Sequence, residues 1–219
     1  MIKVLLMSDC HQNSMAFYPE RMFSEEQSDE IIYNNKPDIL IHLGDIENIN
    51  WLDKIKNEYS KMIIYAVDGN WEKPKKITSL SFKILNWNFY INHGDNGYYS
   101  FDNFKKKFIC NEEKIMKELN YVPDIICLGH THFQQHSILK KPYFFNPGST
   151  NYFLHGNVEE KQYNIDNKTF KGKKIGSYDI MLIQEKIMKI EEWSIIRESL
   201  TNETHYLLEE HHVFTIKNK

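Results

Sequence analysis

Short apolar runs recur along the chain, and polar residues follow most of them. The runs cover residues 2–7, 39–43, 62–67, 82–85, 89–91, 125–128 and 143–145. Nearly continuous apolar runs of this length are typical of strands that are covered on both faces of a sheet. The pattern therefore predicts a sheet-rich core built from short central strands.

Helical periodicity lies between some of these runs. Trp51, Leu52, Ile55 and Tyr59 have the spacing of one face of a short amphipathic helix. A loop and then a helix are expected over residues 15–35, and apolar residues at helical spacing predict another helix over residues 104–119. Strands interleaved with helices predict a mixed α/β fold.

The last part of the chain is more polar. Residues 178–184 and 187–193 predict a hairpin that closes the sheet, and the polar stretch 157–174 predicts a surface excursion. We expect one domain over residues 1–219, with a core that extends to about residue 196 and a polar C-terminal tail over residues 197–219.

Composition narrows the class of protein. A formal net charge of −3 provides no global positive field, so nonspecific attraction to nucleic acid or anionic lipid is not expected. No apolar stretch approaches the ~20 residues of a membrane span, and the apolar N-terminal segment is shorter than a signal peptide. Three cysteines without a CxxC pair argue against a disulfide framework. We therefore expect a cytoplasmic protein with reduced thiols and no membrane partner.

The polar residues that follow the strands are the candidate chemistry. Seven of them carry groups that bind metal ions: Asp9, His11, Asp45, Asn70, His93, His130 and His132. Strand ends at one edge of an open α/β sheet share a crevice, so these side chains can meet despite their separation in sequence. Mixed nitrogen and oxygen donors suit Mn, Fe, Co, Ni or Zn.

The number of donors predicts two cations. Seven donors exceed one tetrahedral site, and a carboxylate can bridge two ions, so we expect a two-metal centre with Asp45 as the bridge. Such a centre activates water and holds the attacking and leaving oxygens of a displacement at phosphorus. Hydrolysis of a phosphate ester is the reaction that this set predicts.

Each motif alone has an ordinary explanation. Gly44-Asp45 and Gly69-Asn70 are common turn dipeptides, and a polar residue after a strand often only caps a turn. The segment from Gly129 to His132 is a stronger indication of a metal site, because alternate residues of an extended segment, here His130 and His132, point to one side. The order and placement of all the strand ends together favour a metal centre. His42, inside an apolar run, is expected to be a hydrogen-bonded core histidine.

The ordered motifs resemble those of one family. They are Asp9-x-His11, Gly44-Asp45, Gly69-Asn70, His93-Gly94, Gly129-His130-x-His132 and Asn146-Pro147-Gly148-Ser149. This set resembles the calcineurin-like metallophosphoesterase superfamily, and within it the small single-domain YfcE-like phosphodiesterases. The resemblance implies a four-layer α-β-β-α sandwich of two facing mixed sheets, with a dimetal site at one edge.

The resemblance also implies a role for each residue. It implies that Asp9, His11, Asp45 and His132 hold one metal, and that Asp45, Asn70, His93 and His130 hold the other. Asp45, Asn70 and His93 are the expected catalytic residues, with Asn70 in contact with the substrate phosphate. Mn is the first expectation for both ions, while Ni, Fe, Co and Zn remain suitable.

The chain departs from the family pattern at three places. Trp71 stands where many members have a histidine that is proposed to protonate the leaving group, and Asp95 stands where members tend to have a second histidine. Without an internal acid, substrates with good leaving groups are favoured. Residues 18–28 are expected to be an insertion that forms a lid or a partner surface.

The leading hypothesis is a metal-dependent phosphodiesterase or phosphatase that acts on a small phosphate ester. One alternative is a scaffold of the same fold that binds a protein partner, as in retromer-type relatives. The other is a nuclease, which the acidic balance disfavours. The substrate's identity and self-association into a homo-oligomer are left open.

Overall fold

The computed structural model describes residues 1–12, 24–48, 50–102, 107–119, 121–150, 160–165, 167–201 and 203–218. Within these residues the helices are α1 (Ser24–Asn35), α2 (Trp51–Glu58) and α3 (Glu112–Glu118). The strands are β1 (Ile2–Met7), β2 (Ile39–His42), β3 (Ile63–Ala66), β4 (Ser79–Ile84), β5 (Trp87–Asn92), β6 (Tyr99–Asp102), β7 (Lys107–Cys110), β8 (Ile125–Leu128), β9 (Gln134–Ser137), β10 (Tyr143–Pro147), β11 (Lys161–Ile165), β12 (Lys168–Ile183), β13 (Ile187–Glu198) and β14 (Thr204–Lys217).

The strands form two mixed sheets and a small ribbon. The first sheet has the order β14-β13-β12-β1-β2-β3, and β11 pairs with β12. The second has the order β4-β5-β8-β10-β9, and β6 pairs with β7 in the ribbon. Strands β1, β2 and β3 are parallel to one another, as are β5, β8 and β10. The carboxyl ends of the parallel strands of each sheet therefore lie at one edge of it.

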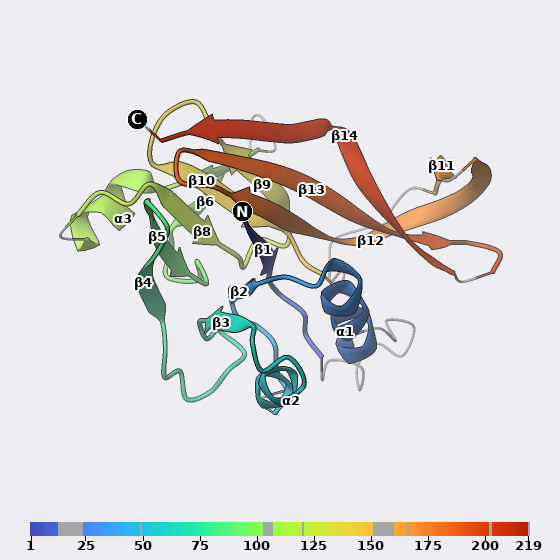
Figure 1. Cartoon of the computed structure of the whole chain (residues 1–219), viewed down its shortest axis with the longest axis horizontal. Coiled ribbons are helices and arrows are strands. Elements are labelled where there is room, and N and C mark those ends of the chain that lie inside the picture. The colour runs from blue at the N-terminus through green and yellow to red at the C-terminus, as the bar shows by residue number, and fades with distance from the viewer. Residues whose placement is uncertain are drawn as a thin grey trace.

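Alternation along the central strands separates the layers. Val4 and Leu6 pack into the core between the two sheets, whereas Leu5 and Met7 face the helices α1 and α2. On the outer face of the second sheet, Tyr90 packs with Ile115 of α3. The layers are thus helices, sheet, sheet, and then α3 with the ribbon (Figure 1). This arrangement confirms the predicted sandwich of two facing mixed sheets.

Most of the predicted strands are confirmed, as are the helix that begins at Trp51 and the closing hairpin, now β12 and β13. Of the helix expected over residues 104–119, residues 104–106 lie outside the described residues, residues 107–110 are not helical, and residues 112–118 are helical as predicted. Residues 107–110 form β7, and α3 begins only after Asn111, whose side chain accepts a hydrogen bond from the N–H of Lys114 at 3.1 Å. Asparagine followed by two glutamates is a helix start signal that the apolar spacing obscured.

The polar segments of the C-terminal part form strands: the stretch expected at the surface is mostly exposed there but is paired as β11 and the start of β12, and the expected tail contains β14. Residues 161–165 and 168–183 form β11 and the long strand β12, and β14 occupies 204–217 of the expected tail. A strand with one solvated face carries many polar residues, so polarity alone does not exclude a strand. Of the expected insertion, residues 18–23 lie outside the described residues and residues 24–28 begin α1.

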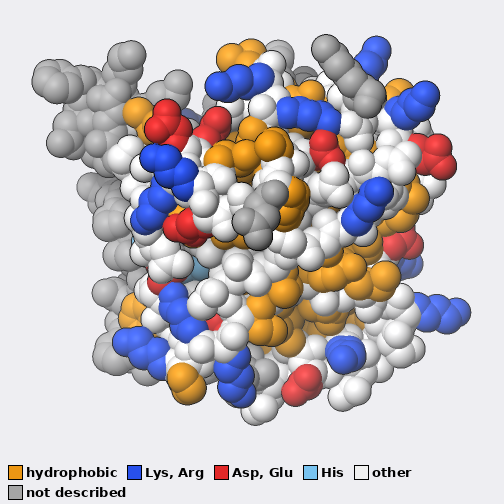
Figure 2. All heavy atoms as spheres, turned by 90° about the vertical axis from the view of Figure 1, so that its left-hand side faces the viewer, with side chains coloured by type: hydrophobic (Ala, Val, Ile, Leu, Met, Phe, Trp, Pro, Cys, Tyr) orange, Lys and Arg blue, Asp and Glu red, His pale blue; other side chains and the backbone are white. Residues whose placement is uncertain are grey.

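The exposed side of the second sheet is partly apolar. Figure 2 shows hydrophobic side chains scattered among lysines and arginines on the side of the molecule where β4, β5 and α3 lie. Strand β4 alternates exposed residues with the half-buried Leu80 and Phe82, as expected of an edge strand. None of the helices in the described parts of the chain is long and apolar enough to cross a membrane.

A buried polar cluster joins the two sheets. His136 of β9 contacts Asp179 of β12 through Nε2 at 3.0 Å and Glu192 of β13 through Nδ1. Gln134 also donates to Asp179, at 2.9 Å. Burial by itself would lower the pKa of His136, but the two carboxylates outweigh burial and raise this pKa to about 9. The cluster therefore holds a buried imidazolium near neutral pH.

This cluster predicts a pH-dependent stability. A folded-state pKa raised from 6.5 to about 9 stabilises the fold fully below 6.5, and the stabilisation is lost as the pH rises through about 9. We expect His136→Gln to lower the free energy of unfolding by about 3 kcal/mol more at about pH 6 than at about pH 10. Urea denaturation at several pH values measures this difference. Ile190→Val is the control, with a cost independent of pH, and an equal cost of His136→Gln at both pH values would contradict the prediction.

Candidate metal centre

The candidate metal centre lies where the strand ends of the two sheets meet. Asp9 and His11 follow β1, and Asp45 follows β2; His93 directly follows β5, and His130 follows β8. Backbone hydrogen bonds tie these loops together. The N–H of Asp9 donates to the carbonyl of Gly44 at 3.0 Å, that of His11 to Asp45 at 2.9 Å, and that of Gly129 to His93 at 2.9 Å. These bonds join the loops within each sheet, and the bond from the N–H of His130 to Oδ2 of Asp9 links the loops of the two sheets.

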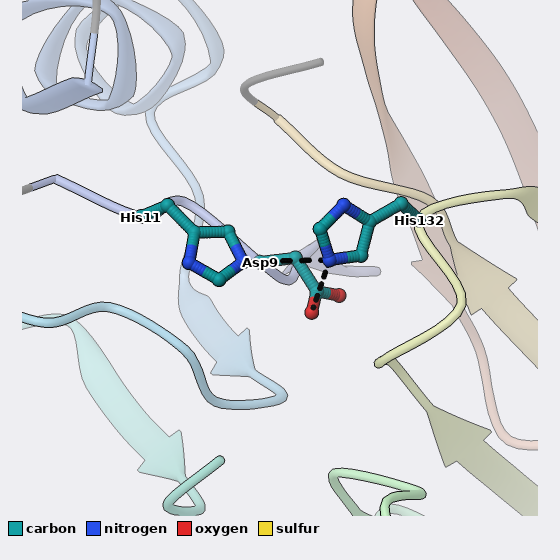
Figure 3. Close-up of side chains that lie close together, drawn as sticks. All are labelled: Asp9, His11 and His132. Carbon is teal, nitrogen blue, oxygen red and sulfur yellow. Dashed lines mark hydrogen bonds and ion pairs between the residues drawn. The ribbon is translucent and has the colours of Figure 1, made fainter. Parts of the chain in front are cut away.

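The first group of candidate ligands consists of Asp9, His11 and His132. The Oδ1 atom of Asp9 lies 3.3 Å from Nε2 of His132, and that nitrogen lies 3.4 Å from Nε2 of His11. Figure 3 shows the two imidazoles, which come from the loops after β1 and β8, facing each other beside the Asp9 carboxylate. Three lone-pair donors thus point into one small volume.

The second group consists of Asp45, His93 and His130, with Asn70 beside them. Nε2 of His93 lies 3.2 Å from Oδ2 of Asp45 and 3.3 Å from Nδ1 of His130. The side-chain oxygen of Asn70 lies 3.0 Å from each of these two ring nitrogens. The structure therefore brings all seven residues predicted from the sequence together.

Asp45 stands between the two groups. Its Oδ2 atom is 3.2 Å from Nε2 of His93 in one group and 3.7 Å from Nε2 of His11 in the other. Its Oδ1 atom accepts a hydrogen bond from the backbone N–H of Trp71 at 2.9 Å. One oxygen thus fixes the carboxylate, while the other is shared between the groups.

The histidines are oriented by partners outside the two groups. Nδ1 of His93 lies 2.7 Å from the carbonyl oxygen of Leu43, which can only accept a hydrogen bond. Nδ1 of His11 lies 2.7 Å from Oε1 of Glu47. These partners place a proton on Nδ1 and turn the lone pair of Nε2 toward the carboxylates, as for histidines that ligate metals.

The donor set fits divalent cations. Oδ2 of Asp9 accepts hydrogen bonds from the hydroxyl of Ser8 at 2.6 Å and the N–H of His130 at 3.0 Å. Oδ1 of Asp9 is buried and, among the described residues, accepts no hydrogen bond. A buried carboxylate oxygen without a donor is costly unless positive charge lies nearby. Mixed carboxylate, imidazole and amide donors suit transition metals and zinc.

The pKa values of the site residues also indicate that its buried carboxylates attract positive charge. Burial by itself would lower the pKa of His93, but Asp45 and Asp9 outweigh burial and raise it to about 9. Burial would raise the pKa of Asp9, yet the positive charges of His132, His93 and His11 lower it well below its usual range. Burial, followed by the charge of His93, lowers the pKa of His130. The buried carboxylates are thus compensated by imidazolium charge in the protein alone.

Backbone strain is concentrated at this site. Nine described residues other than glycine have positive φ, and five of them are predicted ligands: Asp9, His11, Asp45, His130 and His132. Their φ values lie between 47° and 70°, a region that residues with a Cβ seldom adopt. Strain of this kind clusters at functional sites, where the surrounding structure holds it in place.

Two glycines let the ligand loops approach each other. A Cβ on Gly69 would lie 2.0 Å from Oδ1 of Asp45, and one on Gly129 would lie 2.0 Å from the Ser8 hydroxyl and 3.0 Å from Oδ2 of Asp9. The Gly-Asn and Gly-His dipeptides are therefore more than turns, because each glycine makes room for a carboxylate.

Glu72 holds two of the ligand loops, and the sequence analysis assigned it no role. Its carboxylate accepts hydrogen bonds from the N–H groups of Ile46 at 2.6 Å, Gly69 at 2.6 Å, Glu47 at 2.8 Å and Asp45 at 2.9 Å. Burial would raise the pKa of Glu72, but these backbone donors outweigh burial and lower it. The nearest sequence signal is its place three residues after Gly69.

His42 is a core histidine, as predicted. Its side chain is fully buried, and Nδ1 accepts a hydrogen bond from the N–H of Gly44 at 3.2 Å. Nε2 lies 3.0 Å from Sγ of Cys10. Burial lowers the pKa of His42 to about 4, so this ring stays neutral beside the candidate metal centre.

The comparisons with known proteins place the chain in a family. Residues 2–182 match the calcineurin-like phosphoesterase superfamily domain. The chain belongs to this superfamily. No curated protein gives a significant match in sequence.

Solved structures agree with the phosphoesterase fold. Vps29 from Chaetomium thermophilum has a TM-score of 0.66 at 13% identity, over 100% of this chain and 98% of that chain, and it has also been solved with a cyclic peptide. Vps29 from Entamoeba histolytica, solved with zinc, has a TM-score of 0.61 at 16% identity, over 94% and 98%. A predicted phosphoesterase from Streptococcus pneumoniae has a TM-score of 0.51 at 18% identity, over 95% and 98%. At these identities the likeness shows the fold of this phosphoesterase domain.

The contacts of Glu72 predict that it controls metal affinity. In Glu72→Gln an amide NH₂ faces backbone N–H donors, so the loops of Asp45 and Asn70 lose part of their anchor. We expect Mn²⁺ affinity to fall by about 10- to 100-fold. Isothermal titration calorimetry of the metal-free variant, with circular dichroism to verify folding, measures the change.

Glu113→Gln is the matched control for this prediction, because Glu113 is exposed on α3. Glu72→Asp keeps the negative charge and should lie between the wild type and Glu72→Gln. A folded Glu72→Gln variant with unchanged Mn²⁺ affinity would show that the four hydrogen bonds are not needed at the site.

Proposed function

We propose that this phosphoesterase-superfamily protein hydrolyses small phosphate esters with two divalent cations. Asp9, His11, Asp45 and His132 would hold one cation, and Asp45, Asn70, His93 and His130 would hold the other. The observation that carries the proposal is the position of Asp45 Oδ2, 3.2 Å from His93 in one group of donors and 3.7 Å from His11 in the other.

When bound, two divalent cations lower the pKa of water to near neutrality and stabilise the charge of a phosphoryl group. The mixed donors suit Mn²⁺, Fe, Co, Ni and Zn alike. We take Mn²⁺ as the first metal to test. Supply of the ion decides among metals of similar affinity.

The protein's own residues would orient the ester. Asp9 and His93 are buried, whereas His130 is exposed and Asn70 is half-buried, so the substrate would approach from the side of His130. The Asn70 amide, next to His93 and His130, is placed to contact a phosphoryl oxygen there. These residues supply positioning, which is a large part of catalysis at phosphorus.

Neither Trp71 nor Asp95 is a good proton donor for the leaving group. The indole of Trp71 donates no proton to an alkoxide near neutral pH, and the carboxylate of Asp95 forms an ion pair with Lys75. Esters whose leaving groups are stable as anions would therefore react faster than esters of simple alcohols.

The activity test uses bis-p-nitrophenyl phosphate, an ester with a good leaving group. The protein is first freed of metal with a chelator and then loaded with Mn²⁺, and we expect the loaded protein to turn over the ester. Asp45→Asn should lower kcat by about 100-fold or more. His132→Gln should lose activity as well, whereas His205→Gln, on β14, should retain it.

The same experiment separates the competing functions. Absence of turnover with Mn, Ni, Fe, Co and Zn would overturn the proposal and favour a scaffold of the same fold. Equal turnover by Asp45→Asn would show that another site acts. Cleavage of short oligonucleotides in preference to the small diester would favour a nuclease.

A further inference from the structure

Trp71 is a half-exposed aromatic residue at the rim of the candidate metal centre. Its side chain is 51% exposed, and it belongs to none of the three hydrophobic clusters of the described residues. Exposure of so large an apolar ring brings no stability to the protein alone. The ring is therefore available to contact a ligand.

The position of Trp71 is fixed by two contacts of the residue itself. Its N–H donates to Oδ1 of Asp45 at 2.9 Å, and its ring lies edge to face with the imidazole of His11, with centroids 5.7 Å apart. The indole also lies beside Asn70, with Nε1 3.2 Å from its side-chain amide, a distance that is a hydrogen bond only when the amide oxygen faces the indole. The next residue is Glu72, which four backbone N–H groups hold. Trp71 is thus a rigid flat surface beside two predicted ligands and the shared carboxylate.

Other exposed aromatic residues have different surroundings. Phe133, 41% exposed, packs against Phe108 with centroids 4.8 Å apart, and Tyr33, 63% exposed, has Lys36 over its ring. Trp71 contacts the candidate metal centre itself. A ligand phosphate that reached Asn70 would bring its attached group next to the indole.

We propose that Trp71 determines specificity by stacking on a planar aromatic group carried by the phosphate. The site would then prefer aryl or nucleoside phosphates to phosphates of saturated groups of similar size. This inference rests on the proposed binding of phosphate esters at the metal centre. Stacking of a base on an aromatic side chain is tolerant of the base's identity, because each base has a π-face.

The test measures binding, so that it does not depend on turnover. Isothermal titration calorimetry of the Mn²⁺-loaded protein compares phenylphosphonate with cyclohexylphosphonate, and adenosine monophosphate with ribose 5-phosphate. Each pair shares its phosphorus group and differs in the planar ring. The first pair tests an aryl group and the second tests a nucleobase.

We expect Trp71→Leu, which keeps an apolar side chain, to weaken the planar member of at least one pair by about tenfold. The non-planar member should change by less than about twofold, since it makes no stacking contact. Trp71→Phe should restore most of the planar preference. Tyr33→Ala, a change at another exposed aromatic residue, should leave all four affinities unchanged.

The outcomes separate this inference from the proposed hydrolysis. Equal weakening of both members of each pair, no weakening, or no binding of any of the four ligands overturns the role of Trp71. If bis-p-nitrophenyl phosphate is hydrolysed while Trp71→Leu shows no selective loss, only the stacking inference fails. If selective loss occurs without hydrolysis, the stacking inference stands and the proposed reaction fails.

Discussion

The architecture of the site depends on the burial of two carboxylates that need positive charge beside them. Asp9 and Asp45 each turn one oxygen to backbone N–H groups and the other to imidazole nitrogens. Removal of a carboxylate from water costs several kcal/mol unless opposite charge or hydrogen bonds compensate for it. In the protein alone the raised pKa of His93 provides part of that charge. Divalent cations among the same atoms would provide it instead, and the imidazoles would then be neutral.

The rest of the fold holds these groups in place against strain. Left-handed backbone at five predicted ligands costs on the order of 1 kcal/mol or more for each residue. The buried strands β1, β2, β5 and β8 fix the points where the ligand loops begin. At the left-handed turn around Asp45, neighbouring backbone N–H groups donate to the Glu72 carboxylate. Gly69 and Gly129, which lack a Cβ, allow the loops to approach each other. Packing energy in the sheets thus supports an otherwise unfavourable loop layer.

The sequence predicted which side chains meet at this site, because two simple rules apply to them. Each predicted ligand follows an apolar run, buried in all cases except the partly exposed β3 before Asn70, and parallel strands end at the same edge of a sheet. Glu72 escaped prediction because it accepts hydrogen bonds from the backbone of two loops, and Glu47 because it contacts the Nδ1 atom of His11. Contacts of this kind leave no periodic pattern in the sequence. The helix predicted over 104–119 was wrong over residues 107–110, because apolar spacing continued across the start signal at Asn111. Strands β11 and β14 were missed because their solvated faces are polar.

The ligand set does not by itself select a substrate, because side chains outside it decide what else the phosphate carries. Here the rim has an indole at residue 71 and an ion pair between Lys75 and Asp95. Because neither Trp71 nor the paired Asp95 supplies a proton, a leaving group whose negative charge is delocalised is favoured. An exposed indole favours a group that is flat. Aromatic alcohols satisfy both conditions, since the ring that delocalises the charge of the departing oxygen is also the ring that can stack. The proposed hydrolysis and the proposed stacking therefore meet at residue 71, where a tryptophan supplies no acid and offers a flat surface, and both proposals would favour the same class of ester.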